Sequence, residues 1–316
     1  MDGRFEMNYY DKESHCQEAF DQALEAIGPF WHICTPGEFL VCINETAEDF
    51  RFAVSNIAIS ADEAGVVVVS FQVLGNHLHI ILCGSKERCL LMLELYRYRM
   101  VKYLRSKGRP VDLDAFRCDD PIPICSLEAM RNEIVYVNRN GYVADPNVTP
   151  FSYPWGSGIL YFNHLPLEPQ GIPANYLPYK EKRRLTFRSA FTFPSQYRFG
   201  EGMILPISFV NFELGQSFFR DAHHYISMLM KNVESYSELA KRMGDKAVVT
   251  DEEMFAVVKS LVRPECRDLS FSILPHSDKL SIAQKLHFDY HASNQQIRRL
   301  LKLDISLLNE MFPPQL

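Results

Sequence analysis

The segment GVVVVSFQVLGNHLHIILC, residues 65–83, decides the fold of this chain. Its β-branched first half predicts a buried strand, Gly75-Asn76 is typical of a tight turn, and the apolar remainder predicts a second strand. Side chains alternate between the two faces of a strand, so His77 and His79 point to one face and Leu78 points to the other. The segment therefore predicts a hairpin that carries two neighbouring imidazoles near its tip, with Leu78 in the core.

The two imidazoles allow two interpretations. Imidazole is the commonest nitrogen ligand of divalent metals, and His77 and His79 could bind one ion from the same face of the strand. They could equally be two sheet histidines that are hydrogen-bonded to polar neighbours. With ten His among 316 residues, such a pair arises readily by chance. The pair alone does not decide between these interpretations.

The elements around the hairpin predict an α+β fold, because strands and helices follow in the order strand, helix, strand, strand, helix, extended segment, helix. We expect an antiparallel sheet with helices packed on one side of it. The expected elements are a leading helix within 1–29, a strand at 30–35, an extended piece at 38–43, a helix from Thr46 to about 61, the hairpin, a helix at 86–106, an extended segment at 109–125, and a helix from Ser126 to about 139.

The length predicts two domains, or one domain with a large extension. We expect a catalytic-type domain over residues 1–165 and a mainly α-helical region over residues 166–316. Residues 280–312 have the pattern of a helix-turn-helix. However, the last helix of that pattern is apolar and acidic, a poor surface for a DNA major groove. Regulatory DNA binding and plain helical packing both fit this segment.

Composition excludes several classes of protein. An apolar share of 47% and a charged share of 23% are ordinary for a folded, soluble chain. No apolar run approaches a membrane span, and the first residues show no secretory pattern, so we expect no membrane association. Eight Cys without CxxC spacing argue against a zinc finger and favour free thiols in the cytoplasm. The net charge of −6 argues against tight nonspecific binding to nucleic acid.

Basic residues are nevertheless concentrated in two places. Residues 94–109 hold six basic residues, one acid and three Tyr, and residues 180–198 hold six basic residues and one acid. Both runs could face DNA, and the alternative is a solvated helix face and a charged loop. The candidate DNA contacts in the first run are Arg97, Arg99, Lys102 and Arg105.

A second group of polar residues lies at the end of the helix that follows Ser126. Tyr136 and Asn140 are four residues apart, so they share one helix face. The Asn oxygen could ligate a hard cation beside two imidazoles, and the phenol could then reach a phosphorus held on that cation. Arg139 could steady a phosphate oxygen. The alternative is an ordinary helix end, because Asn-Gly at residues 140–141 is a common stop signal.

Taken in order, these segments resemble a known family. The matching segments are WHI at 31–33, FQVLGNHLHIIL at 71–82, YVNRNGYV at 136–143 and YPWGS at 153–157. The pattern is similar to that of the single-tyrosine HUH transposases of small bacterial insertion sequences, and especially to their REP-associated branch. The resemblance covers residues 30–158, half of the chain.

The resemblance implies an HUH, ferredoxin-like (RRM-like) fold and a specific chemistry. By resemblance, His77 and His79 bind Mg²⁺ or Mn²⁺, Asn140 is the third ligand, and Tyr136 is the nucleophile. Such enzymes are single-stranded DNA endonucleases and strand transferases that form a 5′-phosphotyrosine link. They act as homodimers on single-stranded DNA folded into hairpins. The chain departs from the family at Gly75 and Gly141, where relatives carry Pro, and both changes affect turn geometry rather than ligands.

Two other functions remain open. One is a domesticated relative that binds DNA without cutting it, which the acidic net charge favours. The other is an unrelated metallohydrolase that uses His77 and His79 and would need carboxylate ligands nearby. Glu133 is the one residue we can suggest as a base for the Tyr136 phenol. The lead hypothesis requires that the histidine hairpin pack beside the end of the helix that carries Tyr136.

Overall fold

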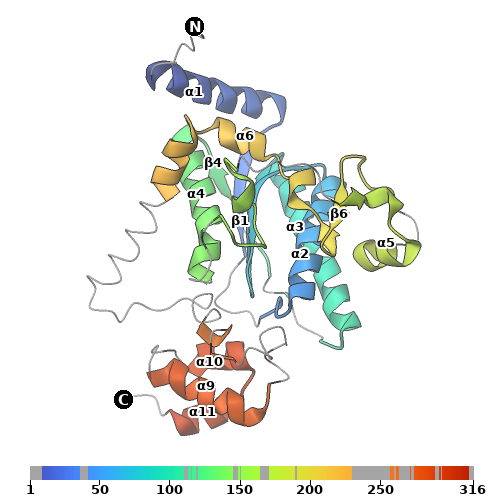
Figure 1. Ribbon diagram of the computed structural model, residues 1–316, viewed down its shortest axis with the longest axis vertical. Coiled ribbons are helices and arrows are strands. Elements are labelled where there is room, and N and C mark those ends of the chain that lie inside the picture. Colours follow the sequence, from blue (N-terminus) through green and yellow to red (C-terminus); the bar gives the residue numbers. More distant parts are fainter. Residues whose placement is uncertain are drawn as a thin grey trace.

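The computed structural model describes residues 9–35, 42–109, 113–114, 116–118, 120–144, 149, 151–163, 171–188, 191–229, 257–259, 261–262, 271, 274–288, 292 and 294–312. Figure 1 shows a central sheet between helices, with a group of short helices at one end. The helices are α1 (Tyr9–Ala26), α2 (Ala47–Ala64), α3 (Lys86–Ser106), α4 (Leu127–Ala144), α5 (Tyr179–Thr186), α6 (Phe212–Ser217), α9 (His276–Phe288), α10 (Asn294–Leu301) and α11 (Ile305–Met311). The strands are β1 (Phe30–Cys34), β2 (Val67–Val73), β3 (Leu78–Cys83), β4 (Ile122–Ile124), β5 (Ile172–Pro173), β6 (Arg198–Gly200) and β7 (Met203–Ile204).

The central sheet has the strand order β2-β3-β1-β4, and every neighbouring pair is antiparallel. β1, α2 and β2 form a β-α-β unit whose two strands are separated by β3. In the same way β3, α3 and β4 form a unit whose strands are separated by β1. This is the split β-α-β arrangement, with the element order β-α-β-β-α-β. The predicted α+β fold class is confirmed.

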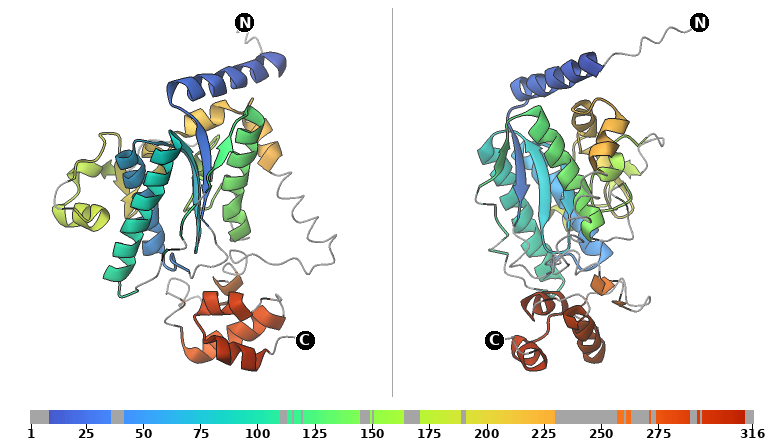
Figure 2. Two further views of the ribbon diagram at one scale, coloured as in Figure 1. Left: turned by 180° about the vertical axis from the view of Figure 1, so that it is seen from behind. Right: turned by 90° about the vertical axis from the view of Figure 1, so that its left-hand side faces the viewer.

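Helices cover both faces of this sheet. Leu78 and Ile80 are fully buried in a core with α2 and α3, whereas Ile81 lies in a second core with α1, α4 and α6. Figure 2, left, shows the same two helical layers from behind. The expectation that helices pack on one side was wrong, because every residue of β3 is buried and its two faces therefore both need cover. Leu78 lies in the core, as its alternation with the two histidines predicts.

The helix starts follow local signals in the sequence. Thr46 caps α2: its hydroxyl accepts a hydrogen bond from the Asp49 amide, and the Asp49 carboxylate accepts one from the Thr46 amide. Ser126 caps α4 by accepting a hydrogen bond from the Ala129 amide at 3.1 Å. The expected stop at Asn140-Gly141 was wrong, since α4 continues to Ala144. A glycine costs a helix only about 1 kcal/mol, which packing of the neighbouring turns can offset.

Residues 171–229 pack on the central body rather than apart from it. β7 contacts α2, and Val210 forms a parallel bridge with Val68 of β2. The Tyr225 hydroxyl accepts a hydrogen bond from Asn138 Nδ2 on α4 at 3.0 Å, and Asn138 Oδ1 accepts one from the Ser70 hydroxyl of β2 at 2.9 Å. The predicted boundary between residues 165 and 166 therefore does not coincide with a break in packing.

The last three helices form a separate core. α9, α10 and α11 bury an apolar cluster that also includes Cys42, Val258, Val262 and Phe271, and in Figure 1 these helices lie together beyond one end of the sheet. Residues 302–304 join α10 to α11, and Asp304 caps α11. The predicted helix-turn-helix pattern thus corresponds to a compact three-helix unit, which we call the C-terminal unit.

The first helix is attached to α4 by an ion pair. Glu13 lies 2.7 Å from Arg131 of α4 and 3.1 Å from Arg220. The hydrogen bond from Arg131 is the main reason that the pKa of Glu13 lies below its ordinary value. Because the folded pKa is lowered, the ion pair stabilises the protein above the unfolded pKa, and this contribution is lost as the pH falls through the folded pKa.

We therefore expect Glu13→Gln to lower the free energy of unfolding at neutral pH by less than about 1 kcal/mol, since the carboxylate is partly exposed. Urea unfolding of wild type and variant measures the difference, which should shrink as the pH is lowered. Glu18→Gln, an exposed position on the same helix, is the matched control and should change nothing. A difference that persists in acid would contradict the assignment.

Candidate active site

A cleft of about 470 Å³ opens between α4 and the central sheet. β1, β3 and β4 supply its floor, and α4 supplies its wall. The residues that line it are His32, Cys34, His79, Ile122, Asn132, Glu133, Tyr136 and Arg139. Titratable side chains that gather in a cleft of this kind are candidates for catalysis.

Strand register and helix spacing together bring these side chains to one place. Cys34 of β1 lies directly opposite His79 of β3, so the neighbouring His32 reaches the same face one pleat away. α4 crosses this face, and the ring of Tyr136 lies 5.3 Å from that of His79 and 5.9 Å from that of His32, between centroids. The histidine hairpin thus packs beside the helix that carries Tyr136, as the lead hypothesis requires, but Tyr136 lies in the middle of that helix rather than at its end.

Three buried histidines form a continuous chain of close polar contacts (His32, His77 and His79). Glu133 Oε2 lies 2.7 Å from His32 Nδ1, and His32 Nε2 lies 3.2 Å from His79 Nδ1. His79 Nε2 in turn lies 3.1 Å from His77 Nε2. The chain ends at Asn76, whose Oδ1 lies 2.9 Å from His77 Nδ1.

The two ends of this chain lie against oxygen atoms. An amide oxygen accepts hydrogen bonds, so His77 Nδ1 donates to Asn76. The Nε2 atoms of His77 and His79 face each other across 3.1 Å, a distance at which either a shared proton or a metal ion can hold two imidazole nitrogens together.

The arrangement fits a divalent metal ion. Two nitrogens that bind an octahedral ion at right angles, each about 2.1 Å from it, stand about 3.0 Å apart. Burial, with smaller effects from His77 and His32, holds the pKa of His79 well below its ordinary value, so its imidazole is in the neutral form that metals require. His32 and Asn76 hold the two rings in orientation, as outer partners of metal ligands do.

The remaining ligands are not evident from side chains of the usual kinds. Within the described ranges, no group of three or more His, Cys, Asp or Glu side chains is arranged to hold a metal ion. A bound ion at His77 and His79 would thus need oxygen ligands from another residue type, from water or from a substrate. Glu133, the carboxylate at the end of the histidine chain, lies against His32 instead.

Asn140, which the sequence suggests as third ligand, lies one turn after Tyr136 on α4. Its Nδ2 donates a hydrogen bond to the carbonyl oxygen of Tyr136 at 2.9 Å, and this bond uses the amide nitrogen rather than the oxygen that would ligate a cation. The sequence predicts that Tyr136 and Asn140 share a helix face, but it does not predict the hydrogen bond from Asn140 to the backbone of Tyr136.

Two arginines of α3 are covered by neighbouring residues rather than exposed to solvent. Arg99 is buried, and its guanidinium binds Glu63 and donates to the Ser60 hydroxyl of α2 at 2.9 Å. The prediction that Arg99 contacts DNA was therefore wrong, because helical spacing alone does not show that a long charged side chain turns inward. Arg97 pairs with Glu94 at 2.6 Å and is mostly covered.

Two other candidates on that helix stay at the surface. Arg105 is exposed, and Lys102 Nζ lies 4.2 Å from the ring centroid of the exposed Tyr98. However, α3 covers the face of the sheet opposite the cleft. Arg139 alone among the predicted DNA contacts lines the cleft, with its guanidinium 5.4 Å from the ring of Tyr136.

His32 is a site residue whose role the sequence did not indicate. It belongs to one of the segments that resemble the transposase family, but the sequence does not show which residue of β3 it meets. The pairing of β1 with β3 settles this, since Cys34 lies opposite His79 and His32 opposite Ile81. The sequence does contain a histidine two residues before a cysteine in a central strand. Its place in the site becomes clear only from the register in which β1 pairs with β3.

A scan of protein-family models, a search of curated proteins and a search of solved structures each found no match to this chain. None of the helices within the described ranges is long and apolar enough to cross a membrane.

Proposed function

We propose that this protein is a metal-dependent endonuclease and strand transferase that cuts single-stranded DNA through Tyr136. The observation that carries the proposal is the position of the Tyr136 ring, 5.3 Å from that of His79, in a cleft that also holds Arg139. A phenol, a pair of facing imidazole nitrogens and a guanidinium are the groups that phosphoryl transfer to tyrosine needs. The order of the segments along the chain, which resembles the HUH transposases, supports the same chemistry.

The proposed reaction is a displacement at phosphorus. The Tyr136 oxygen attacks the scissile phosphorus, and the bond from phosphorus to the 3′ oxygen breaks. The phenol gives up its proton, for which Glu133 in the same cleft is the candidate acceptor, and the departing 3′ oxygen gains one from solvent. The product is a 5′-phosphotyrosine and a free 3′-OH. Attack by a 3′-OH on the phosphotyrosine reverses these steps and joins the strands.

His77 and His79 would hold the Mg²⁺ or Mn²⁺ ion of the proposed reaction. Such an ion supplies positive charge that polarises the scissile phosphate and favours departure of the 3′ oxygen. Arg139 lies beside Tyr136 and can hold a non-bridging phosphate oxygen through charge-assisted hydrogen bonds. Lys102 and Arg105 lie across the sheet, so they could contact only DNA that extends well beyond the cut site.

The test is formation of a covalent adduct. The protein is incubated with Mn²⁺ and a pool of single-stranded oligonucleotides that each contain a hairpin with randomised flanks. A denaturing gel separates the covalent adduct, and peptide mapping identifies the modified residue. We expect an adduct on Tyr136 that requires the metal ion. An adduct on another tyrosine would overturn the assignment of the nucleophile.

Loss of a histidine should remove metal binding. We expect His79→Gln to weaken Mn²⁺ binding by about 100-fold or more, since changes to the outer partners of metal ligands already cost 10- to 100-fold. Titration calorimetry with Mn²⁺ alone measures the affinity. His223→Gln, at an exposed histidine away from the cleft, is the control. Equal affinity of His79→Gln and wild type would show that the ion is held elsewhere.

One observation favours a second candidate, a protein of the same fold that binds DNA without cutting it. In the part of the chain that the structure describes, no third His, Cys, Asp or Glu completes the metal site. The same assay separates the two functions. A non-cutting protein would retain oligonucleotides on a native gel and form no adduct on a denaturing gel.

A further inference from the structure

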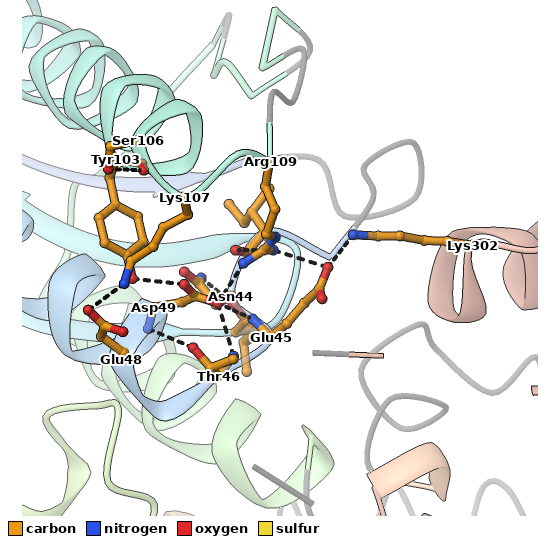
Figure 3. Close-up of polar contacts among 12 residues, drawn as sticks. Asn44, Glu45, Thr46, Glu48, Asp49, Tyr103, Ser106, Lys107, Arg109 and Lys302 are labelled. Atoms are coloured by element: carbon orange, nitrogen blue, oxygen red, sulfur yellow. Dashed lines mark hydrogen bonds and ion pairs between the residues drawn. The ribbon is translucent and has the colours of Figure 1, made fainter. Parts of the chain in front are cut away.

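The C-terminal unit contacts the body of the protein at the segment that precedes α2. The side chain of Cys42 is buried in the core of the C-terminal unit, although it lies far away in sequence. Lys302, between α10 and α11, extends toward the body and binds Glu45 (Figure 3). Residues 42–45 are thus held from one side by the C-terminal unit.

Glu45 is the centre of this contact. Its side chain is fully buried, and it accepts from Lys302 and lies 3.0 Å from Arg109. Arg109 also lies 2.8 Å from Asp49 and donates to the carbonyl oxygen of Ile43 at 3.2 Å. Figure 3 shows Arg109, three residues after the end of α3, and Lys302, from the C-terminal unit, converging on Glu45. A buried carboxylate needs such partners, because an uncompensated charge inside a protein is strongly unfavourable.

The residues just before Glu45 hold the turn that carries the first histidine. The amides of Ile43 and Asn44 both donate to the carbonyl oxygen of Gly75, at 2.8 and 2.9 Å. Asn44 Nδ2 donates to the carbonyl oxygen of Leu74 at 2.8 Å. The turn is closed by the Leu74 amide, which donates to the carbonyl oxygen of His77 at 3.0 Å. An unbroken set of contacts therefore runs from Lys302 to the backbone of His77.

We propose that Glu45 is a positioning residue for the His77 turn, and that the C-terminal unit acts as a clamp on that turn through Lys302. The inference rests on the proposed metal site, and it assigns that site a dependence on the last three helices. When the clamp is in place, the turn holds the two Nε2 atoms at the separation that an ion needs. When the C-terminal unit is displaced, residues 42–45 lose one side of their support and the turn loosens.

The consequence is a coupling between the C-terminal unit and metal affinity. Any partner that binds the C-terminal unit in a way that withdraws Lys302 from Glu45 would weaken the hold on the ion. Reciprocally, a bound ion would strengthen docking of the C-terminal unit by the same factor. The last three helices would then control the active site without contributing a residue to it.

The experiment compares Lys302→Met with Arg298→Met, which removes a positive charge from an exposed position of α10. Titration with Mn²⁺ alone gives the metal affinity, and hydrogen–deuterium exchange of the metal-free protein reports on the amides of residues 42–45 and 74–79. For Lys302→Met we expect about 5- to 10-fold weaker Mn²⁺ binding and faster exchange in both segments. Arg298→Met should match wild type, and Lys302→Arg should restore most of the loss.

A second variant keeps the test decisive if Lys302→Met folds poorly. Glu45→Gln keeps the shape of the side chain and should give the same exchange pattern, and adding Lys302→Met to it should change little further. Faster exchange confined to α9–α11, with residues 74–79 unchanged, would overturn the proposal. If wild type binds no Mn²⁺ at all, the proposed function fails, and the exchange data alone then decide whether the clamp exists.

Discussion

Tyr136→Phe is expected to reduce the covalent protein–DNA adduct by about 1,000-fold or more, because it removes the only oxygen that can attack phosphorus from that position. The variant keeps the aromatic ring, so the edge-on contacts with His79 and His32 remain. The side chain is 39% exposed, and loss of its hydroxyl should cost little stability. Mn²⁺ affinity and the unfolding midpoint should therefore match wild type.

The control for this change is Tyr98→Phe, at an exposed tyrosine on α3 across the sheet from the cleft. It should form the adduct as wild type does. An adduct that survives in Tyr136→Phe would rule out Tyr136 as the nucleophile. An equal loss in both variants would point to DNA binding rather than to chemistry, since both tyrosines would then act through contacts with the strand.

Arg99→Ala is expected to lower the free energy of unfolding by about 3–5 kcal/mol, which would be the largest stability effect among the basic residues of α3. The guanidinium is buried against Glu63 and Ser60 of α2, so its removal leaves a carboxylate that is mostly buried without its main partner. Arg188 also binds Glu63, at 3.0 Å, and should soften the loss in part. Urea unfolding followed by circular dichroism measures the change.

Arg105→Ala on the same helix is the matched control, because Arg105 is exposed and its loss should change stability by no more than about 0.5 kcal/mol. Replacing both members of the buried pair, as in Glu63→Gln with Arg99→Met, should recover part of the stability that the single change loses. An Arg99→Ala variant with normal stability but weak DNA binding would instead support the role that the sequence suggested.

The parts of this fold that could be predicted from the sequence are those set by neighbours along the chain. The hairpin at 67–83 follows from β-branched residues around Gly75-Asn76, and the starts of α2 and α4 follow from Thr46 and Ser126. Hydrophobic alternation, capping and turn residues act over a few positions, so the printed sequence contains them directly.

What the sequence could not supply depends on contacts between distant segments. To predict helices on both faces of the sheet, one must know that β3 is buried on both sides. The place of His32 beside His79 requires the pairing of β1 with β3, and the inward turn of Arg99 requires Glu63 to lie across from it. For His32 and Arg99 the residue type was visible, but the partner lay about 35 to 50 positions away, beyond any local pattern.

The hydrogen bond between Tyr225 and Asn138 bears on how this protein can have changed over time. Asn138 lies two residues after the proposed nucleophile, and its amide donates a hydrogen bond to a side chain 87 positions later in the chain. The helix that carries the proposed nucleophile and the segment that ends near Tyr225 therefore depend on each other for packing. Recombination that exchanged everything after residue 165 would remove the residues that pack on α4, such as Phe218 and Tyr225. Exchange of the last three helices would leave those residues in place.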